Sequence, residues 1–134
     1  MGTPQTESVM QTYLTEVVGN QKFDLIPEFT AAEMVDHTQP ELRGPDALIA
    51  HARTFCGNIP DLKVEVLNVF GTDDMAVGIW RWHGTPTQPV WGRGVSCKPV
   101  IPNLVASVFR FEDGMLVEYR PFVDAMEIFA QLAD

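Results

Sequence analysis

Apolar residues in the first part of the chain recur with the period of an α-helix. One stripe, at i, i+1, i+4, i+5 spacing, is formed by Val9, Met10, Tyr13, Leu14, Val17 and Val18. This stripe predicts an amphipathic helix over about residues 4–18, with Thr3 as its cap and Gly19-Asn20 at its end.

Two shorter patterns predict further helices with a strand between them. A short helix is indicated by the three-residue spacing of Phe23, Ile26 and Phe29, provided that Pro27 lies within its first turn. Residues 33–37 are typical of a short strand. Gly44-Pro45-Asp46 then opens a third helix. Its apolar face is formed by Leu48, Ile49, Ala52, Phe55 and Cys56.

After Pro60 the apolar period changes from 3.6 to 2, which indicates strands. The expected strands are 62–70, 75–83, 104–111 and 116–123. An Asp-Gly pair at Asp113-Gly114 favours a hairpin between the last two. The prolines and glycines of residues 84–103 predict a long loop or an irregular hairpin.

Helices followed by hairpins predict one α+β domain over residues 1–134, with a mainly antiparallel sheet. Strand alternation places Arg81 and His83 on one face of their strand, and Trp80 and Trp82 on the other. In the last strand one parity is shared by Leu116, Glu118, Arg120, Phe122 and Asp124, unless Pro121 marks a bulge. A short C-terminal helix is expected after that strand.

Composition narrows the class of protein. The 134 residues are 46% hydrophobic and 20% charged, which suits a compact domain and argues against disorder. A formal net charge of −9 repels nucleic acid and anionic lipid, so we expect neither as a partner. Cys56 and Cys97 form no CxxC motif, so we expect neither a zinc site nor a disulfide framework. Without a basic leader or a long apolar run, the chain is expected to be cytoplasmic.

Several side chains could carry chemistry. Asp124 is either the N-cap of the last helix or a buried carboxylate that exchanges a proton near neutral pH. Arg81 and His83 are either a surface pair or groups that orient Asp124, stabilise an oxyanion and carry a proton. His37 is more typical of a hydrogen-bonded structural histidine, and His51 of a partly exposed helix residue.

The three tryptophans, Trp80, Trp82 and Trp91, are first of all packing residues, but they would also suit an apolar or aromatic ligand. The sequence contains no GxGxxG, GxxxxGK, GxSxG or HExxH motif. Nucleotide binding, serine hydrolysis and zinc proteolysis therefore lack their usual signatures.

Short motifs in a fixed order resemble the SnoaL-like polyketide cyclases. This family lies in the nuclear transport factor two-like superfamily, which also contains ketosteroid isomerase and limonene epoxide hydrolase. The motifs are Val35-Asp36-His37, residues 43–48, residues 59–64, Gly84-Thr85, residues 109–114, Val117-Glu118 leading to Asp124, and Gln131-Leu132. Together with the opening helix they cover nearly the whole chain.

The resemblance implies a cone-shaped barrel, usually in a homodimer. A curved, mainly antiparallel sheet and three N-terminal helices would enclose a deep apolar pocket. The family's cyclases transfer protons by acid/base catalysis without a metal or organic cofactor, and their final-strand Asp falls on Asp124. The ketosteroid isomerase base corresponds to a position near Asp36 or His37. Epoxide hydrolases use an Arg-x-Asp pair where this chain has Arg81-x-His83, so that acid partner is missing.

Departures from the family pattern point to a different substrate. Arg120 stands where the family usually has Trp, and residues 80–83 replace a strand that is usually rich in Thr. The segment 86–102 also lacks the family's common Pro-Thr-Gly turn.

The leading hypothesis is a cofactor-independent cyclase or isomerase that acts on a hydrophobic, polyketide-like or terpenoid-like small molecule. Asp124 would be the general base or acid, Arg81 and Arg120 would stabilise an enol or alkoxide oxygen, and His83 or His37 would carry a second proton. The substrate-binding residues would be Trp80, Trp82, Trp91, Phe122 and Tyr13. Alternatives are an epoxide hydrolase or epoxide-opening cyclase that uses Asp36 or Asp124, and a non-catalytic small-molecule-binding or dimerisation module.

Overall fold

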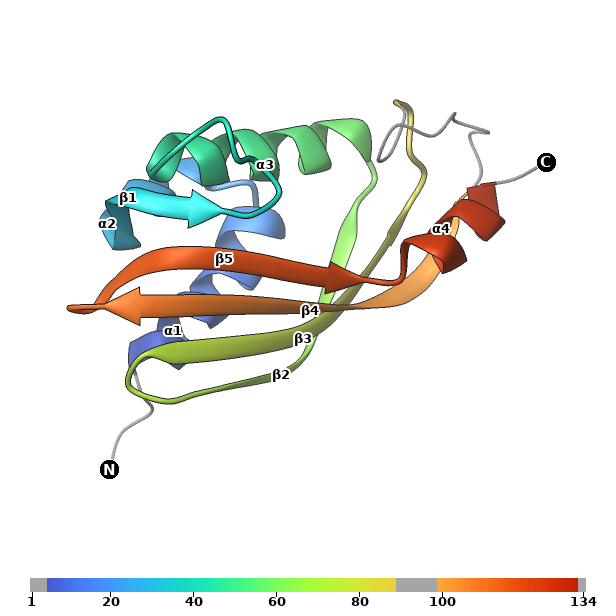
Figure 1. Ribbon diagram of the computed structural model, residues 1–134. Coiled ribbons are helices and arrows are strands. Elements are labelled where there is room, and N and C mark those ends of the chain that lie inside the picture. The colour runs from blue at the N-terminus through green and yellow to red at the C-terminus, as the bar shows by residue number, and fades with distance from the viewer. Residues whose placement is uncertain (1–4, 89–98, 133–134) are drawn as a thin grey trace.

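The computed structural model describes residues 5–88 and 99–132, which form an open five-stranded sheet with helices against it (Figure 1). The strands are β1 (Thr30–Asp36), β2 (Lys63–Gly71), β3 (Met75–Gly84), β4 (Val100–Glu112) and β5 (Met115–Val123). They are arranged in the order β1-β5-β4-β3-β2. β1 pairs in parallel with β5, and all other neighbours are antiparallel. The predicted α+β fold with a mainly antiparallel sheet is confirmed.

The helices are α1 (Gln5–Thr12), η1 (Tyr13–Val18), η2 (Phe23–Leu25), α2 (Ile26–Phe29), α3 (Pro45–Asn58) and α4 (Ala125–Leu132). α1 and η1 together form the first predicted helix, but η1 is a π-helix. The N–H of Gly19 bonds to the carbonyl of Leu14 at 3.1 Å, which is the i→i+5 bond of that winding. Pro27 lies in the first turn of α2, as the sequence required.

The hairpin predicted at Asp113-Gly114 is confirmed by positive φ angles of 51° and 79° at these two residues. The strand before it is longer than predicted, because β4 begins at Val100 and takes in the end of the expected loop. Trp91 and Cys97 lie outside the described residues.

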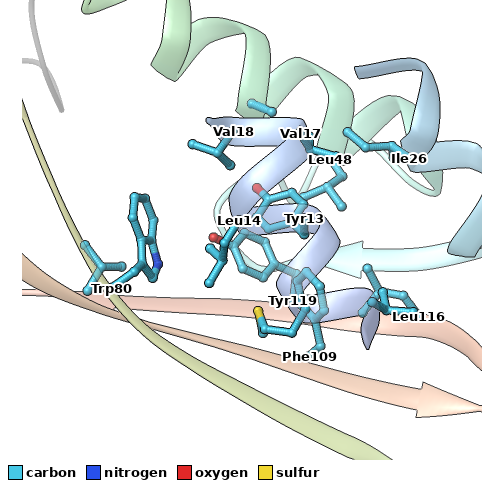
Figure 2. Close-up of a cluster of buried hydrophobic side chains, with 14 of the residues drawn as sticks. Tyr13, Leu14, Val17, Val18, Ile26, Leu48, Trp80, Phe109, Leu116 and Tyr119 are labelled. Carbon is cyan, nitrogen blue, oxygen red and sulfur yellow. The ribbon is translucent and has the colours of Figure 1, made fainter. Parts of the chain in front are cut away.

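The helices cover one face of the sheet, which we call the inner face. α1 packs on β2 and β3, and α3 packs on β1. Helix and sheet meet in a buried cluster (Figure 2) that includes Tyr13, Leu14, Val17, Val18, Ile26, Leu48, Trp80, Phe109, Leu116 and Tyr119. Burial of these side chains is the main stabilising contribution to the fold.

Two strands determine which side chains reach the inner face. In β3 the predicted alternation is confirmed, since Trp80 and Trp82 are buried while His83 is exposed. In β5 the bulge is not at Pro121. Arg110 pairs with Glu118 but Phe111 pairs with Leu116, so Val117 is the extra residue. This bulge changes the parity of the buried residues of β5. Beyond it the inner face carries Tyr119, Pro121 and Val123, and the outer face carries Arg120 and Phe122.

Within the described part of the chain, no helix is both long and apolar enough to cross a membrane.

Candidate active site

A cavity of about 240 Å³ lies between the helices and the inner face of the sheet. It is lined by Tyr13, Val18, Thr38, Gln39, His51, Ala52, Thr54, Phe55, Asn58, Ile59, Trp80, Trp82, Val105, Tyr119, Pro121 and Val123. Most of this lining is apolar or aromatic, with a few polar groups, as in small-molecule sites. The lining among the described residues contains no Lys, Arg, Asp or Glu side chain.

A histidine and a carboxylate meet beside this cavity. His51 Nδ1 lies 2.9 Å from Oδ2 of Asp36. The hydroxyl of Thr38 donates to Oδ1 of the same carboxylate at 2.6 Å, and the backbone N–H of Thr38 donates to it at 2.9 Å. The side chain of Asp36 is 0% exposed and that of His51 is 22% exposed. The carboxylate is therefore fully enclosed, whereas the imidazole reaches the cavity.

The chain brings these two residues together through a tight contact between α3 and β1. Asp36 is the last residue of β1, and α3 starts immediately after Gly44. Gly44 has a φ of 69°, and a Cβ there would lie 2.5 Å from the carbonyl oxygen of Ala32 in β1. Its N–H also bonds to the carbonyl of Met34 at 2.8 Å. Glycine thus allows α3 to start against β1, so that His51 lies over the end of the strand.

The electrostatics of this pair favour an ionised carboxylate. Burial by itself raises the pKa of Asp36, but the hydrogen bonds from His51 and Thr38 and the charge interaction with His51 lower it below its ordinary value. An ionised carboxylate can only accept hydrogen bonds, so Nδ1 of His51 carries the proton. In neutral imidazole the other nitrogen, Nε2, then has a free lone pair, and it has no hydrogen-bond partner among the described residues.

Two buried tyrosines flank the imidazole. Tyr119 is the register partner of Asp36 across the β1–β5 pair, and its ring centroid is 5.3 Å from that of His51. The ring of Tyr13 lies 5.8 Å from that of Tyr119. Burial raises the pKa of both phenols, and the negative charge of Asp36 raises both further. Both therefore remain protonated and serve as hydrogen-bond donors.

The opposite wall of the cavity is aromatic. Phe55 of α3 meets Trp82 edge to face, with centroids 5.3 Å apart, and Trp80 in the same way at 6.3 Å. Trp80 stands across from the tyrosine pair (Figure 2). Trp80, Trp82 and Tyr13 line the cavity, where the sequence placed them. The cavity thus combines the His51 imidazole and the two phenols with an aromatic wall.

Asp124, Arg81 and His83 were expected in this pocket, but the structure places all three outside its lining. Asp124 is exposed and accepts the N–H of Glu127 at 3.1 Å, so it caps α4. Arg81 points to the outer face, where its Nε donates to Glu65 at 2.6 Å. His83 is exposed on the same face because it shares the parity of Arg81. The Asp124 carboxylate therefore does not reach the cavity.

His37, Arg120 and Phe122 also lie on the outer side. His37 Nε2 is 2.8 Å from Glu118, and Arg120 Nη2 is 3.4 Å from the same carboxylate. Arg110 completes this group by donating from its Nε to Glu118. Phe122 is 57% exposed. The structure therefore brings His37 and Arg120 together, but around Glu118 and away from the cavity. The bulge at Val117 reverses the expected parity of Arg120 and Phe122.

Sequence reasoning did not single out His51, Thr38 or Tyr119 as site residues. The signal for His51 was its position on the flank of the apolar stripe of α3, one turn before Phe55. Tyr119 carried no comparable signal, because its inward direction depends on the bulge. Asp36 was named as a possible base only through the family resemblance.

The described residues contain no group of three or more His, Cys, Asp or Glu side chains that could hold a metal ion.

The sequence model of the family described as SnoaL-like polyketide cyclase matches residues 8–132. The chain belongs to the SnoaL-like polyketide cyclase family. The match runs from within α1 to the end of α4 and includes both partners of the Asp36–His51 pair. No curated protein matches the sequence.

Solved structures of similar fold agree with this assignment. TsrD from Streptomyces laurentii has a TM-score of 0.84 at 18% identity, covering 96% of this chain and 95% of its own. A SnoaL-like polyketide cyclase from Agrobacterium tumefaciens C58 has a TM-score of 0.79 at 17% identity, covering 99% and 100%. IdmH from Streptomyces antibioticus has a TM-score of 0.72 at 20% identity, covering 94% and 97%. At these identities the likeness establishes the shared fold alone, so chemistry has to be argued from the site.

Proposed function

We propose that this protein is a cofactor-independent cyclase or isomerase that moves protons on a neutral, hydrophobic, polyketide-like or terpenoid-like small molecule. His51 is the general acid/base in this proposal, and Asp36 orients it. The observation that carries the proposal is the Asp36–His51 pair, whose carboxylate is enclosed and whose imidazole lines a mostly apolar cavity. Membership of a family described as polyketide cyclases supports the reaction class.

His51 is suited to act as the base because its tautomer is fixed. The carboxylate of Asp36 holds the proton on Nδ1, so Nε2 is free to accept a proton from a substrate carbon. The carboxylate also stabilises the imidazolium that results from this transfer. Thr38 adds two hydrogen bonds to Asp36 and keeps the carboxylate in place.

The tyrosines are suited to stabilise the charge that proton removal creates. When Nε2 removes a proton next to a carbonyl group, the electron pair of the C–H bond moves onto the carbonyl oxygen and gives an enolate. A phenol hydroxyl from the Tyr13–Tyr119 pair donates to that oxygen. Preorganised donors of this kind stabilise developing negative charge in a water-poor site.

The second half of the reaction decides between cyclase and isomerase. In a cyclase the enolate carbon forms a C–C bond with a second carbonyl carbon of the same molecule, and the new alkoxide takes the proton from imidazolium. In an isomerase the imidazolium returns the proton to another carbon of the enolate system. Both outcomes return His51 to its starting state and need no oxidant or reductant.

The lining supports a neutral substrate. A carboxylate or phosphate would find no Lys or Arg among the described residues of the cavity wall. The aromatic wall of Phe55, Trp80 and Trp82 suits a ring system instead. We therefore expect an unsaturated or aromatic ring at this wall and a carbonyl group at the tyrosines.

The same proposal includes a homodimer formed through the outer face of the sheet. In the described part of the chain this face carries a partly exposed apolar centre formed by Val77, Ile79, Leu104, Ala106, Val108 and Phe122. Leu104 is 56% exposed and Phe122 is 57% exposed. A second copy of the chain would cover this surface with an equivalent surface, as in two-fold interfaces.

Hydrogen exchange in a small ketone tests the proposed reaction without knowledge of the natural substrate. The probe is 2-tetralone, a neutral bicyclic ketone with acidic α-hydrogens, whose exchange in deuterated water is followed by NMR. The protein should accelerate exchange above the buffer rate, and His51→Gln should lower this acceleration by about 10²- to 10⁴-fold. The matched control is His83→Gln, which removes an exposed imidazole from the outer face and should leave the rate unchanged.

Two results would contradict the proposal. In the first, 2-tetralone binds, as judged by quenching of tryptophan fluorescence, but its hydrogens exchange at the buffer rate. This result supports a small-molecule-binding module instead. The other is equal loss of exchange in His51→Gln and His83→Gln.

A further inference from the structure

Three buried polar groups beside the cavity form one hydrogen-bonded series. The indole Nε1 of Trp80 donates to Oγ of Ser107 at 3.0 Å. Ser107 Oγ lies 3.4 Å from the hydroxyl of Tyr119. The ring of Tyr119 in turn packs against that of Tyr13, with centroids 5.8 Å apart. The proposed function uses only the tyrosine end of this hydrogen-bonded series.

The chemistry of the first member fixes the direction of the series. An indole N–H can donate a hydrogen bond but cannot accept one. Ser107 must therefore accept from Trp80, and its own hydroxyl proton is left to be donated onward. Among the described residues, the only other side-chain partner of this hydroxyl is Tyr119. Ser107 is fully buried, so water does not compete for that proton.

A count of protons identifies what the series offers to the cavity. Trp80, Ser107 and Tyr119 together carry three N–H or O–H protons. The two links, from Trp80 to Ser107 and from Ser107 to Tyr119, use two of them. The phenol proton of Tyr119 remains, on a residue that lines the cavity. Tyr119 thus has a donor to present to a ligand, and its oxygen already receives the donor behind it.

We propose that Trp80 and Ser107 are positioning residues, which orient Tyr119 as a hydrogen-bond donor, and that the site therefore stabilises negative charge that develops on the oxygen of a bound ring compound. The enolate formed from a neutral cyclic ketone and the ionised form of a bound phenol carry such a charge. This inference rests on the proposed function, since it explains how the enolate oxygen is held. It assigns a role to Ser107, which does not line the cavity, and a second role to Trp80 besides packing.

Ionisation of a bound phenol tests this inference without any turnover. The probe is 4-nitrophenol, whose phenol and phenolate forms have different absorption spectra, so their ratio in the bound state can be measured directly. Ser107→Ala should lower the phenolate-to-phenol ratio of the bound probe about three- to tenfold, the effect of one lost hydrogen bond. Ser107→Thr, which restores the hydroxyl, should recover the ratio. Ser8→Ala, on the exposed surface of α1, should leave it unchanged.

Trp80→Phe provides a second variant in case Ser107→Ala does not fold. It removes the indole N–H but keeps an aromatic ring, so the ratio should fall in the same direction. An unchanged ratio in the folded variants, or failure of the wild-type protein to bind 4-nitrophenol, overturns the inference. If the phenolate-to-phenol ratio responds as expected but the wild-type protein does not exchange 2-tetralone, the hydrogen-bonded series is supported and the proposed reaction is contradicted. If His51→Gln loses exchange but Ser107→Ala leaves the ratio unchanged, the proposed reaction is supported and the role of Ser107 is contradicted.

Discussion

The inner and outer faces of the sheet are made from alternate residues of the same strands, yet they carry opposite chemistry. On the outer face, charged groups satisfy one another, as in Arg81 with Glu65 and Arg120 with Glu118. On the inner face, the polar groups are fewer and more enclosed. His51 lines the cavity there, and its Nε2 has no hydrogen-bond partner among the described residues. The candidate site is therefore marked by one oriented imidazole in an apolar lining rather than by a high density of charge.

The largest expected difference between the two regions concerns two aspartates. Asp36→Asn keeps one acceptor oxygen, which Thr38 can occupy, and places an NH2 donor opposite His51 Nδ1, so it should favour the wrong tautomer and lower the rate of 2-tetralone exchange by about 10²- to 10⁴-fold. Asp124→Asn keeps a capping side chain on the exposed surface and should change the rate by less than about twofold. A larger loss of exchange rate in Asp124→Asn than in Asp36→Asn would contradict this prediction and would indicate a site at the end of β5.

A smaller effect is expected for the apolar centre of the outer face. Phe122→Glu places a charge where a second copy would pack, so it should weaken the dimer at least about tenfold, which corresponds to about 1.4 kcal/mol. Sedimentation velocity over a concentration series measures the change. Leu42→Glu, an exposed apolar residue outside the sheet, serves as the matched control. A wild-type protein that sediments as a monomer at all concentrations would contradict the proposed interface.

The smallest effect concerns Glu118 and acid stability. Hydrogen bonds from His37 and then Arg110 lower the pKa of Glu118 to about 2, from an ordinary value of 4.5. Because this pKa is depressed in the folded state, its stabilising contribution is complete above pH 4.5 and is lost as the pH falls towards 2. Glu118→Gln should lower the unfolding midpoint at pH 6 by about 2–4 °C, and this difference should shrink on acidification.

Thermal melts between pH 6 and pH 2 check this prediction. Glu112→Gln is the control, since Glu112 also binds Arg110 but is 62% exposed and should contribute less. A constant difference between wild type and Glu118→Gln across this range would mean that the ion pairs around Glu118 do not contribute as the structure suggests.

The sequence predicted the fold well because local patterns determine most of it. The helical stripe of Val9 to Val18, the Asp113-Gly114 hairpin and the alternation of Trp80 and Trp82 each depend on nearby residues alone. The sequence also contained the correct alternative for Asp124, the helix cap.

The site could not be predicted to the same extent because it depends on contacts between distant segments. Asp36 and His51 meet only when α3 packs on β1, which the glycine at position 44 permits. Tyr119 faces inward only because Val117 forms a bulge, and a one-residue shift of register moves every later side chain to the other face. Neither event has a clear local signal. Arg81 and His83, the residues with the most obvious chemistry, lie on the outer face because they share one parity of β3.

The central claim, that Asp36 fixes His51 with a free Nε2 in the cavity, is tested most directly by ¹⁵N NMR of the histidine rings. The chain has only three histidines, so the spectrum is simple to assign. At a pH where the rings are neutral, His51 should carry its proton on Nδ1. A cavity ligand such as 4-nitrophenol should shift the signals of His51 and leave those of His37 and His83 unchanged. A proton on Nε2 of His51, or ligand-induced shifts at His37 or His83 in its place, would contradict the account.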